Sequence, residues 1–526
     1  MTENQYDVVV IGASLGGMQA AISACMRGKR VYLSEEYDWV GGQMTTQAVP
    51  PDENHWIETQ GGTRRYHEYR RQVRAHYQAM PTATEEIKQN DLFWTGESWV
   101  SRLAHEPTVA AKILTASLRP YIRQGLLTLD MNTVPVAART EGNRVTAVMV
   151  KNTKTGEEKT VAGRYFLDGT EMGDLLPLCG AEYVCGAESH AQTGEPGAPE
   201  QAAPHDLQPV TWVAALEWDE KDPGEMEKPA QYDKYAALLL PGRAGQGGCR
   251  QLGWEYFSDA THDKTGWGML DGEYAPGRQG MWTYRRIVSA HQFTDHPNDV
   301  TLLNCSMNDY YGGNLMENPR AQEHREQAKE LTRCVVWWLR NDAPHMDGSG
   351  KKGYPVKLCP RVMGTEDGLA KAPYVRESRR IQALYTIPEN DMSKLLRDAP
   401  KVYEDSVGVG HYAMDLHTTT QSHSSRYAPT YPFEIPLGAL IPVRMENLLP
   451  ACKNLGTTHL TNGCYRLHPV EWNIGESAGY LAAFCVEKGV TPRQVREDAA
   501  LLHAFQTLLE DEGVQLHWHF DEMGQV

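Results

Sequence analysis

Short apolar runs separated by glycine-rich turns are the first recurring pattern along this chain. Residues 6–11 (YDVVVI) form such a run and lead through a glycine-rich turn, residues 12–17, into a helix of small residues. A second run, residues 30–34 (RVYLS), ends at the acidic Glu35. A buried strand, a glycine-rich turn, a helix and a second strand in this order predict the start of a dinucleotide-binding α/β fold.

Further strand patterns follow this first unit. Residues 144–167 contain two β-branched runs around the turn at Thr155-Gly-Glu, so we expect a β-hairpin there. The hairpin leads into an acid- and glycine-rich run, residues 168–174, which we expect to form another loop over the ligand. Residues 126–131 and 447–451 are apolar enough to be core strands.

Two helices are predicted near the C-terminal end. Residues 471–485 include small residues such as Gly475 and Gly479, which would let a helix lie against a flat ligand or a neighbouring strand. The final helix is expected to begin at Thr491, because Thr caps free amide groups and the following Pro492 fits the first helical position.

The first turn has the chemistry of a diphosphate-binding site. Gly12 permits the tight turn, Gly17 allows close packing on the sheet, and the helix N-terminus offers free N–H groups. Ser14 replaces the middle glycine of the G-x-G-x-x-G pattern, and its hydroxyl can donate to a phosphate oxygen. Glu35 lies where a carboxylate accepts hydrogen bonds from an adenosine ribose, roughly 20 residues after the turn, with Glu36 as the alternative.

The composition narrows the possible partners and location. Hydrophobic residues make up 41% and charged residues 23% of the chain, as in soluble globular proteins. A net charge of −17 repels phosphate backbones, so we expect no nucleic-acid partner. No run approaches the roughly 20 apolar residues that cross a bilayer, so we expect no membrane partner. The early first strand leaves no space for a signal peptide, and ten scattered cysteines without a C-x-x-C pair indicate reduced thiols and a cytoplasmic protein.

Taken together, several runs resemble the FAD-dependent oxidoreductase family, whose fold is related to the glutathione reductase and fumarate reductase flavoproteins. The runs are residues 12–17 (GASLGG), 38–43 (DWVGGQ), 168–174 (DGTEMGD) and 466–479 (RLHPVEWNIGESAG), with further similarity at 308–310, 364–370, 376–380 and 415–417. They cover nearly the whole chain. The resemblance implies that FAD is the cofactor.

The resemblance also implies a Rossmann-like, glutathione-reductase-type FAD-binding domain with an inserted α+β substrate domain that closes over the isoalloxazine. We expect FAD-binding segments at 1–185 and 436–490, the substrate domain at 186–435, and a C-terminal helix and tail at 491–526. The expected cofactor-binding residues are Gly12, Ser14, Leu15, Gly16, Gly17, Glu35, Glu36, Gly42, Gln43, Asp168, Gly169, Thr170, Gly173, Asp174, Asn473, Ile474 and Gly475. Related flavoproteins often place an acid near the ribitol after the late strand, but residues 451–456 (ACKNLG) contain none.

Histidine is the natural base for a flavin enzyme that oxidises an alcohol or amine, because it titrates closest to working pH. We expect His468 to be the base or its orienter and Arg466 to anchor an anion, with His459 nearby, because all three precede the small-residue helix. A buried hydrogen-bonded loop without catalytic function is the alternative for this segment.

A second histidine cluster lies at residues 411–417 (HYAMDLH). Strand alternation would place His411, Asp415 and His417 on one face of the strand. The two imidazoles could then act as catalytic bases that face the substrate, or as metal ligands. We expect no metal, because a flavin already supplies the electron sink, and a solvated or interface strand remains the structural alternative. Arg376 either binds a carboxylate or belongs to a salt-bridged helix end.

These patterns predict an FAD-dependent oxidase or dehydrogenase that removes a hydride from a polar organic small molecule. A carbohydrate or glycoside hydroxyl is the first candidate substrate. Residues 238–248 are glycine-rich but precede neither a convincing helix nor a ribose acid, so we expect electrons to leave to oxygen or another acceptor rather than to come from NADPH. A flavin-dependent monooxygenase and a flavin-bound interaction protein with structural FAD are the alternatives, and a homo-oligomer remains open.

Overall fold

A seven-stranded sheet carries the dinucleotide-binding turn. The computed structural model describes residues 5–241, 248–295 and 298–523. The strand order is β3-β2-β1-β6-β5-β4, and β23 also pairs with β6. The strands are β1 (Gln5–Ile11), β2 (Val31–Ser34), β3 (Leu127–Asp130), β4 (Thr133–Glu141), β5 (Arg144–Asn152), β6 (Glu158–Asp168) and β23 (Leu448–Pro450). β1, β2, β3, β6 and β23 run parallel, whereas β4, β5 and β6 form an antiparallel meander.

The predicted strands and hairpin are confirmed, and the sheet contains one strand more than expected. β5 and β6 form the predicted hairpin, while β3 and β23 are the predicted core strands. The additional strand, β4, pairs with β5 at the edge of the sheet. It includes Pro135, which an edge strand tolerates because one side of the strand needs no hydrogen-bond donors.

Helices α1 (Leu15–Met26) and α12 (His468–Lys488) pack directly against each other. A Cβ atom built on Gly475 would lie 2.0 Å from the backbone oxygen of Gly16, and one on Gly479 would lie 2.2 Å from another α1 oxygen. These two glycines therefore allow close helix–helix packing. The expectation that they face a flat ligand or a neighbouring strand is wrong.

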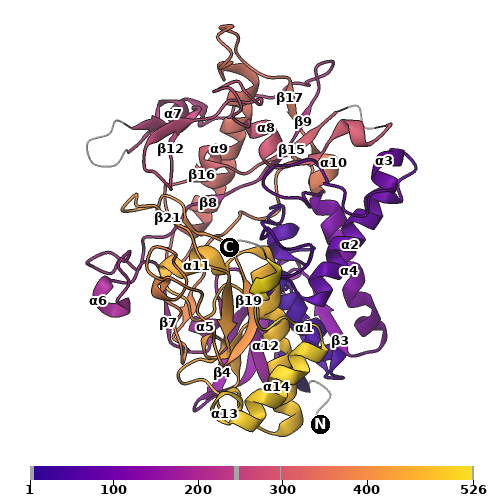
Figure 1. The fold of residues 1–526 in the computed structure, drawn as a ribbon, viewed down its shortest axis with the longest axis vertical. Coiled ribbons are helices and arrows are strands. Elements are labelled where there is room, and N and C mark those ends of the chain that lie inside the picture. Colours follow the sequence, from indigo (N-terminus) through magenta and orange to yellow (C-terminus); the bar gives the residue numbers. More distant parts are fainter. Residues whose placement is uncertain (1–4, 242–247, 296–297, 524–526) are drawn as a thin grey trace.

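A four-stranded antiparallel sheet lies at the other end of the molecule, in the order β14-β15-β9-β17 (Figure 1). Its strands are β9 (Ala214–Trp218), β14 (Arg286–Val288), β15 (Val300–Leu303) and β17 (Val356–Leu358), and the long helix α9 (Ala321–Asn341) packs beside it. The central part of the chain thus builds a second sheet, separate from the one that carries the dinucleotide-binding turn.

The remaining helices and strands lie outside these two sheets. The helices are α2 (Arg64–Gln78), α3 (Glu85–Lys88), α4 (Pro107–Arg123), α5 (Leu175–Leu178), α6 (His190–Thr193), α7 (Tyr232–Ala237), α8 (Met281–Tyr284), α10 (Pro360–Met363), α11 (His459–Tyr465), α13 (Pro492–Glu497) and α14 (Ala499–Asp511). The paired short strands are β7 (Tyr183–Val184) with β18 (Arg380–Ile381), β8 (Val210–Thr211) with β16 (Asp309–Tyr310), β10 (Leu239–Leu240) with β11 (Cys249–Arg250), β12 (Glu255–Phe257) with β13 (Lys264–Gly266), β19 (Ser406–Gly410) with β22 (Phe433–Pro436), and β20 (Met414–Leu416) with β21 (Arg426–Ala428). Within the described ranges no helix is long and apolar enough to cross a membrane.

Two further expectations concern the C-terminal helix and the glycine-rich residues 238–248. The Thr491 side chain caps α13 as predicted, but α13 ends at Glu497 and Asp498 caps a separate helix, α14, so the single C-terminal helix is wrong. The glycine-rich stretch 238–248 falls partly on residues 242–247, which lie outside the described residues. On either side of them, β10 and β11 pair antiparallel.

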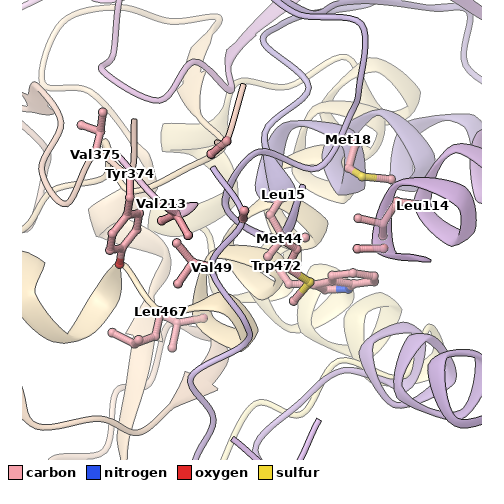
Figure 2. Close-up of a cluster of buried hydrophobic side chains, with 14 of the residues drawn as sticks. Leu15, Met18, Met44, Val49, Leu114, Val213, Tyr374, Val375, Leu467 and Trp472 are labelled. Carbon is pink, nitrogen blue, oxygen red and sulfur yellow. The ribbon is translucent and has the colours of Figure 1, made fainter. Parts of the chain in front are cut away.

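Buried apolar side chains connect the two ends of the molecule. Figure 2 shows one such cluster, in which side chains of α1 and α12 lie near those of the segments around Val213 and Tyr374. The labelled residues are Leu15, Met18, Met44, Val49, Leu114, Val213, Tyr374, Val375, Leu467 and Trp472. This shared core fixes the position of the segment around Tyr374 relative to the dinucleotide-binding turn.

Candidate active site

A cavity of about 320 Å³ opens around the turn that follows β1. Its position at the carboxyl end of a parallel sheet is where open α/β folds bind ligands. Eight of the predicted cofactor-binding residues line it: Gly12, Ser14, Glu35, Glu36, Gly42, Gly169, Thr170 and Asp174. Sequence reasoning missed several other lining residues, among them Thr46, Gln47, Thr133, Glu171, Arg325 and Val375.

Close backbone packing shapes the turn at this cavity. Gly12 has a φ of +89°, and a Cβ there would lie 2.5 Å from the oxygen of Gly169. No side chain other than hydrogen fits this position, so the glycine is required. The Ser14 hydroxyl oxygen accepts a hydrogen bond of 3.1 Å from the Gly17 N–H and caps α1. Its hydroxyl hydrogen can still be donated to a ligand.

The two acids after β2 have different surroundings. Glu35 is buried, and its carboxylate accepts from the N–H groups of Ala13 (2.9 Å) and Tyr37 (3.1 Å). Burial raises the pKa of Glu35 to about 8. Glu36 is more exposed and lies 3.8 Å from Arg325 of α9. Both line the cavity, so the choice of Glu35 as the ribose acceptor stays a prediction.

The other predicted cofactor-binding residues do not line this cavity. They are Leu15, Gly16, Gly17, Gln43, Asp168, Gly173, Asn473, Ile474 and Gly475. The Asp168 carboxylate accepts from Thr170 and Leu175, so it orders the loop after β6 rather than pointing to a ligand. The Asn473 side chain donates to the Val407 oxygen and accepts from the Val409 N–H, which attaches α12 to β19. Neighbouring Ile474 is fully buried in the core.

A buried polar network lies beyond this cavity, and His417 is at its centre. His417 Nδ1 lies 2.8 Å from Asp309 Oδ2. Arg376 donates from Nη2 to Asp309 Oδ1 at 3.0 Å and from Nη1 to Thr211 Oγ1 at 2.8 Å. Burial alone would raise the pKa of Asp309, but Arg376 and His417 hold it below its usual value. Asp309 is therefore a carboxylate that fixes the orientation of the His417 ring.

Strand register brings these distant residues together. Asp309 of β16 is the partner of Thr211 of β8, and Thr211 forms a bridge with Tyr374 on its other side. Arg376 follows two residues later. His417 comes directly after β20, and its N–H donates to the Gln208 side chain at 3.1 Å. The expected strand over residues 411–417 is wrong, because β20 begins only at Met414.

Arg466 belongs to the same network through its guanidinium group. It donates to the Tyr374 hydroxyl and to the Asp415 backbone oxygen, the latter at 3.1 Å. The Asp415 carboxylate lies 3.7 Å from Arg466 Nη2 and 3.7 Å from His417 Nε2. Of the predicted catalytic residues, the structure thus brings Arg466 and His417 together.

The other three predicted catalytic histidines have different partners. His468 Nδ1 accepts from the Asp52 N–H at 3.1 Å, and burial lowers its pKa to about 3. Burial would also lower the pKa of His459, but the Glu377 carboxylate, 2.5 Å from His459 Nδ1, raises it. His411 packs against Trp56 with ring centroids 5.1 Å apart, and burial lowers its pKa to about 4. None of the three lines the cavity around the turn after β1 or the second cavity, beside His417, that is described next.

A second cavity, of about 60 Å³, opens beside His417. Its walls include the aromatic side chains of Trp254, Tyr256, Trp267 and Tyr311, and we call it the aromatic cavity. Asp259 also lines this aromatic cavity, and burial raises its pKa to about 6. A histidine oriented by a carboxylate therefore faces a small space that combines ring faces with polar groups.

Comparison with known protein families identifies the chain. The model of a family described as FAD dependent oxidoreductase matches residues 7–509. The chain belongs to this family. This FAD-dependent oxidoreductase is an enzyme with FAD as its cofactor, and its parallel sheet with the glycine-rich turn is a Rossmann-like FAD-binding fold.

Solved structures give flavoprotein neighbours of this FAD-dependent oxidoreductase at low identity. The myxobacterial chondrochloren halogenase CndH is 18% identical, with a TM-score of 0.21 over 42% of this chain and 46% of that chain. The aromatic hydroxylase CabE from angucycline biosynthesis is 16% identical, with a TM-score of 0.24 over 41% and 38%. A geranylgeranyl bacteriochlorophyll reductase-like protein from Thermoplasma acidophilum is 11% identical, with a TM-score of 0.31 over 98% and 85%. The chain spans less than half the length of the first two proteins. The search of curated proteins found no match.

The residues around the first cavity fit FAD. Gly12 and Gly169 pack backbone against backbone and line the cavity beside the N-terminus of α1, which attracts anions such as a diphosphate. Among the described residues, the buried oxygens Gln43 Oε1 and Glu171 Oε1 have no hydrogen-bond partner, which marks them as groups available to a ligand. Ser14, Glu35 and Thr170 would hold FAD here, and bound FAD supplies an acceptor for a hydride.

Proposed function

We propose that this FAD-dependent oxidoreductase oxidises a hydroxyl group of a polar organic small molecule, with His417 as the base. One observation supports this most strongly: the Asp309–His417 pair faces the aromatic cavity, while residues 372–376 run from the FAD cavity to Arg376 beside Asp309. A substrate next to His417 would therefore be close to both the base and the cofactor site.

The proposed reaction needs one proton acceptor from the protein. Asp309 accepts from His417 Nδ1–H, which leaves Nε2 to take the proton of the substrate hydroxyl. Bound FAD would supply the acceptor for the hydride of the carbon that carries the hydroxyl, so the alcohol would become a carbonyl, and oxygen or another acceptor would take up the electrons. In this proposal His417 replaces His468, because a histidine with a pKa of about 3 is too weak to hold the proton.

A carbohydrate or glycoside hydroxyl is the first substrate class we propose. The aromatic cavity offers Trp254 and Trp267 as flat apolar surfaces and Asp259 as a hydrogen-bond partner. Sugars present both apolar faces and hydroxyl donors, so this combination suits them. We further propose a cytoplasmic location, which the absence of disulfides among the ten cysteines supports.

Anaerobic reduction of the bound flavin by a substrate panel tests the proposal. We expect sugars or glycosides to bleach the visible flavin band without NADPH. His417→Ala should slow bleaching about 10²- to 10⁴-fold, the usual contribution of a general base, and should keep the yellow colour. His468→Asn is the matched control, and its rate should stay within about threefold of the wild type.

Three outcomes would contradict this proposal. Undiminished bleaching in His417→Ala would remove His417 as the base. Bleaching by NADPH alone would favour a monooxygenase, and a flavin that no candidate reduces would favour a structural role for FAD.

A further inference from the structure

A buried lysine lies between two glutamates, Glu171, which lines the FAD cavity, and Glu471. Lys453, shortly after β23, is fully buried, and its ammonium pairs with the carboxylate of Glu171, which lines the cavity. The same ammonium lies 4.0 Å from Glu471 Oε2. Burial alone would lower the pKa of Lys453, but the Cys452 thiol and the two carboxylates raise it. The side chain is therefore a fixed positive charge.

This lysine is close to the end of the helix that receives a diphosphate in dinucleotide-binding folds. Glu471 Oε1 accepts from the Gly16 N–H, in the first turn of α1, at 3.1 Å. Gln43 Nε2 donates to the other oxygen of Glu471, while Gln43 Oε1 is buried without a partner among the described residues. The N-terminus of α1 attracts anions, so an anion bound there would be attracted by both the helix and the Lys453 ammonium.

The Glu171 carboxylate lies in the same region of the cavity. A Cβ built on Gly42 would lie 2.1 Å from Glu171 Oε1, so the carboxylate is pressed against the backbone of another residue that lines the cavity. That oxygen is buried and has no hydrogen-bond partner within the described part of the chain. A buried carboxylate oxygen without a donor is costly, so Glu171 can move away at little loss when a better anion arrives.

We propose that Lys453 is the counter-charge for the FAD diphosphate, and that Glu171 competes with the diphosphate for it. The single ammonium of Lys453 faces two carboxylates, those of Glu171 and Glu471. A diphosphate placed beside them would add further negative charge to a protein whose net charge is already −17. Lys453 therefore changes partner from Glu171 to the diphosphate when FAD binds, and Glu171 moves out of the way.

Opposite effects of two substitutions test this exchange. We would measure the dissociation constant of FAD from its fluorescence as deflavinated full-length protein is titrated. Lys453→Met should raise the constant at least tenfold, and Lys453→Arg should keep it within about threefold. Glu171→Gln should lower it about threefold or more, because the competitor is lost. The wild-type constant should also rise more steeply with sodium chloride than that of Lys453→Met.

Lys401→Met is the matched control, because its partner Asp391 does not line the FAD cavity, whereas Glu171, the partner of Lys453, does. Its FAD affinity should equal that of the wild type. Weaker FAD binding in Glu171→Gln would show that the ion pair only holds the fold together. An unchanged constant in Lys453→Met would place the diphosphate elsewhere. Should Lys453→Met fail to fold, the Glu171→Gln variant still tests the proposal: tighter FAD binding supports the competition, and weaker binding contradicts it. All these readouts are independent of His417.

Discussion

Two histidines that look equivalent in the sequence differ in what they can do, and only His468 is buried. His417 is held by Asp309 through one nitrogen and faces a cavity with the other side of its ring. His468 is fully enclosed, and its Nδ1 accepts a hydrogen bond from the Asp52 N–H. Burial lowers the pKa of His468 to about 3, so it stays neutral at working pH. The surroundings of a histidine, rather than its place in a motif, decide whether it can serve as a base.

The low pKa of His468 predicts a particular acid sensitivity. Between pH 6.5 and 3 the unfolded chain binds a proton that the folded protein does not, so the free energy of unfolding falls as pH decreases through this window. His468→Asn keeps an acceptor for the Asp52 N–H but cannot titrate. From pH 7 to 4.5, we expect the wild type to lose about 2 kcal/mol more than this variant, since one pKa unit is worth about 1.4 kcal/mol. Urea titrations at the two pH values measure the difference.

The exposed His503 provides the control for that experiment. His503→Asn should respond to pH as the wild type does. Parallel losses in the wild type and His468→Asn would show that His468 is not kept neutral by the fold.

Residues of the site were predictable where their contacts are local. Ser14 and Glu35 belong to one strand–turn–helix–strand unit, and both line the cavity. Asp309 was not recognised as a partner of His417, because they lie 108 residues apart and meet only through strand pairing. No spacing rule connects such residues. Arg325 reaches the cavity from α9 and gave no signal in the sequence for the same reason.

At the scale of secondary-structure elements, the packing of α12 against α1 requires a close approach of the two backbones. Gly475 brings α12 so close that a Cβ would lie 2.0 Å from the Gly16 oxygen. The small residues of α12 were visible in the sequence, but their partner was not, because α1 lies at the opposite end of the chain. β4 was not predicted because Pro135 interrupts the sequence pattern of a strand.

Gly475→Ala should destabilise the protein by about 1–3 kcal/mol, the usual cost of overpacking a core. In an unconstrained helix the same change stabilises by up to about 1 kcal/mol, so the sign alone is diagnostic. The added methyl group would clash with the backbone of Gly16, which cannot change rotamer as a side chain can. Denaturant unfolding of the two proteins measures the effect. A gain in stability would show that α1 and α12 are further apart than described.

On the scale of the whole molecule, the FAD cavity gathers residues from both ends. Ser14 and Glu35 come from the main sheet, Arg325 from α9, and Val375 from the segment that bridges to β8. The N–H of Ala372 also donates to the Thr46 oxygen at 2.9 Å, which joins this segment to the dinucleotide half. A cofactor in this cavity would contact both halves at once, and its binding energy would hold them together.

FAD should therefore stabilise the entire chain rather than one half. At a free concentration 100 times the dissociation constant, a ligand that binds only the folded state adds about 2.7 kcal/mol. We expect the melting temperature of deflavinated protein to rise steadily with added FAD, in one transition followed equally by tryptophan fluorescence and circular dichroism. Arg325→Ala removes a cavity residue of α9 together with its contacts to Glu36 and the Tyr37 hydroxyl after β2, so the increase at a fixed FAD concentration should shrink. Two separate transitions, only one of them sensitive to FAD, would mean that the two halves unfold independently and that the cofactor does not join them.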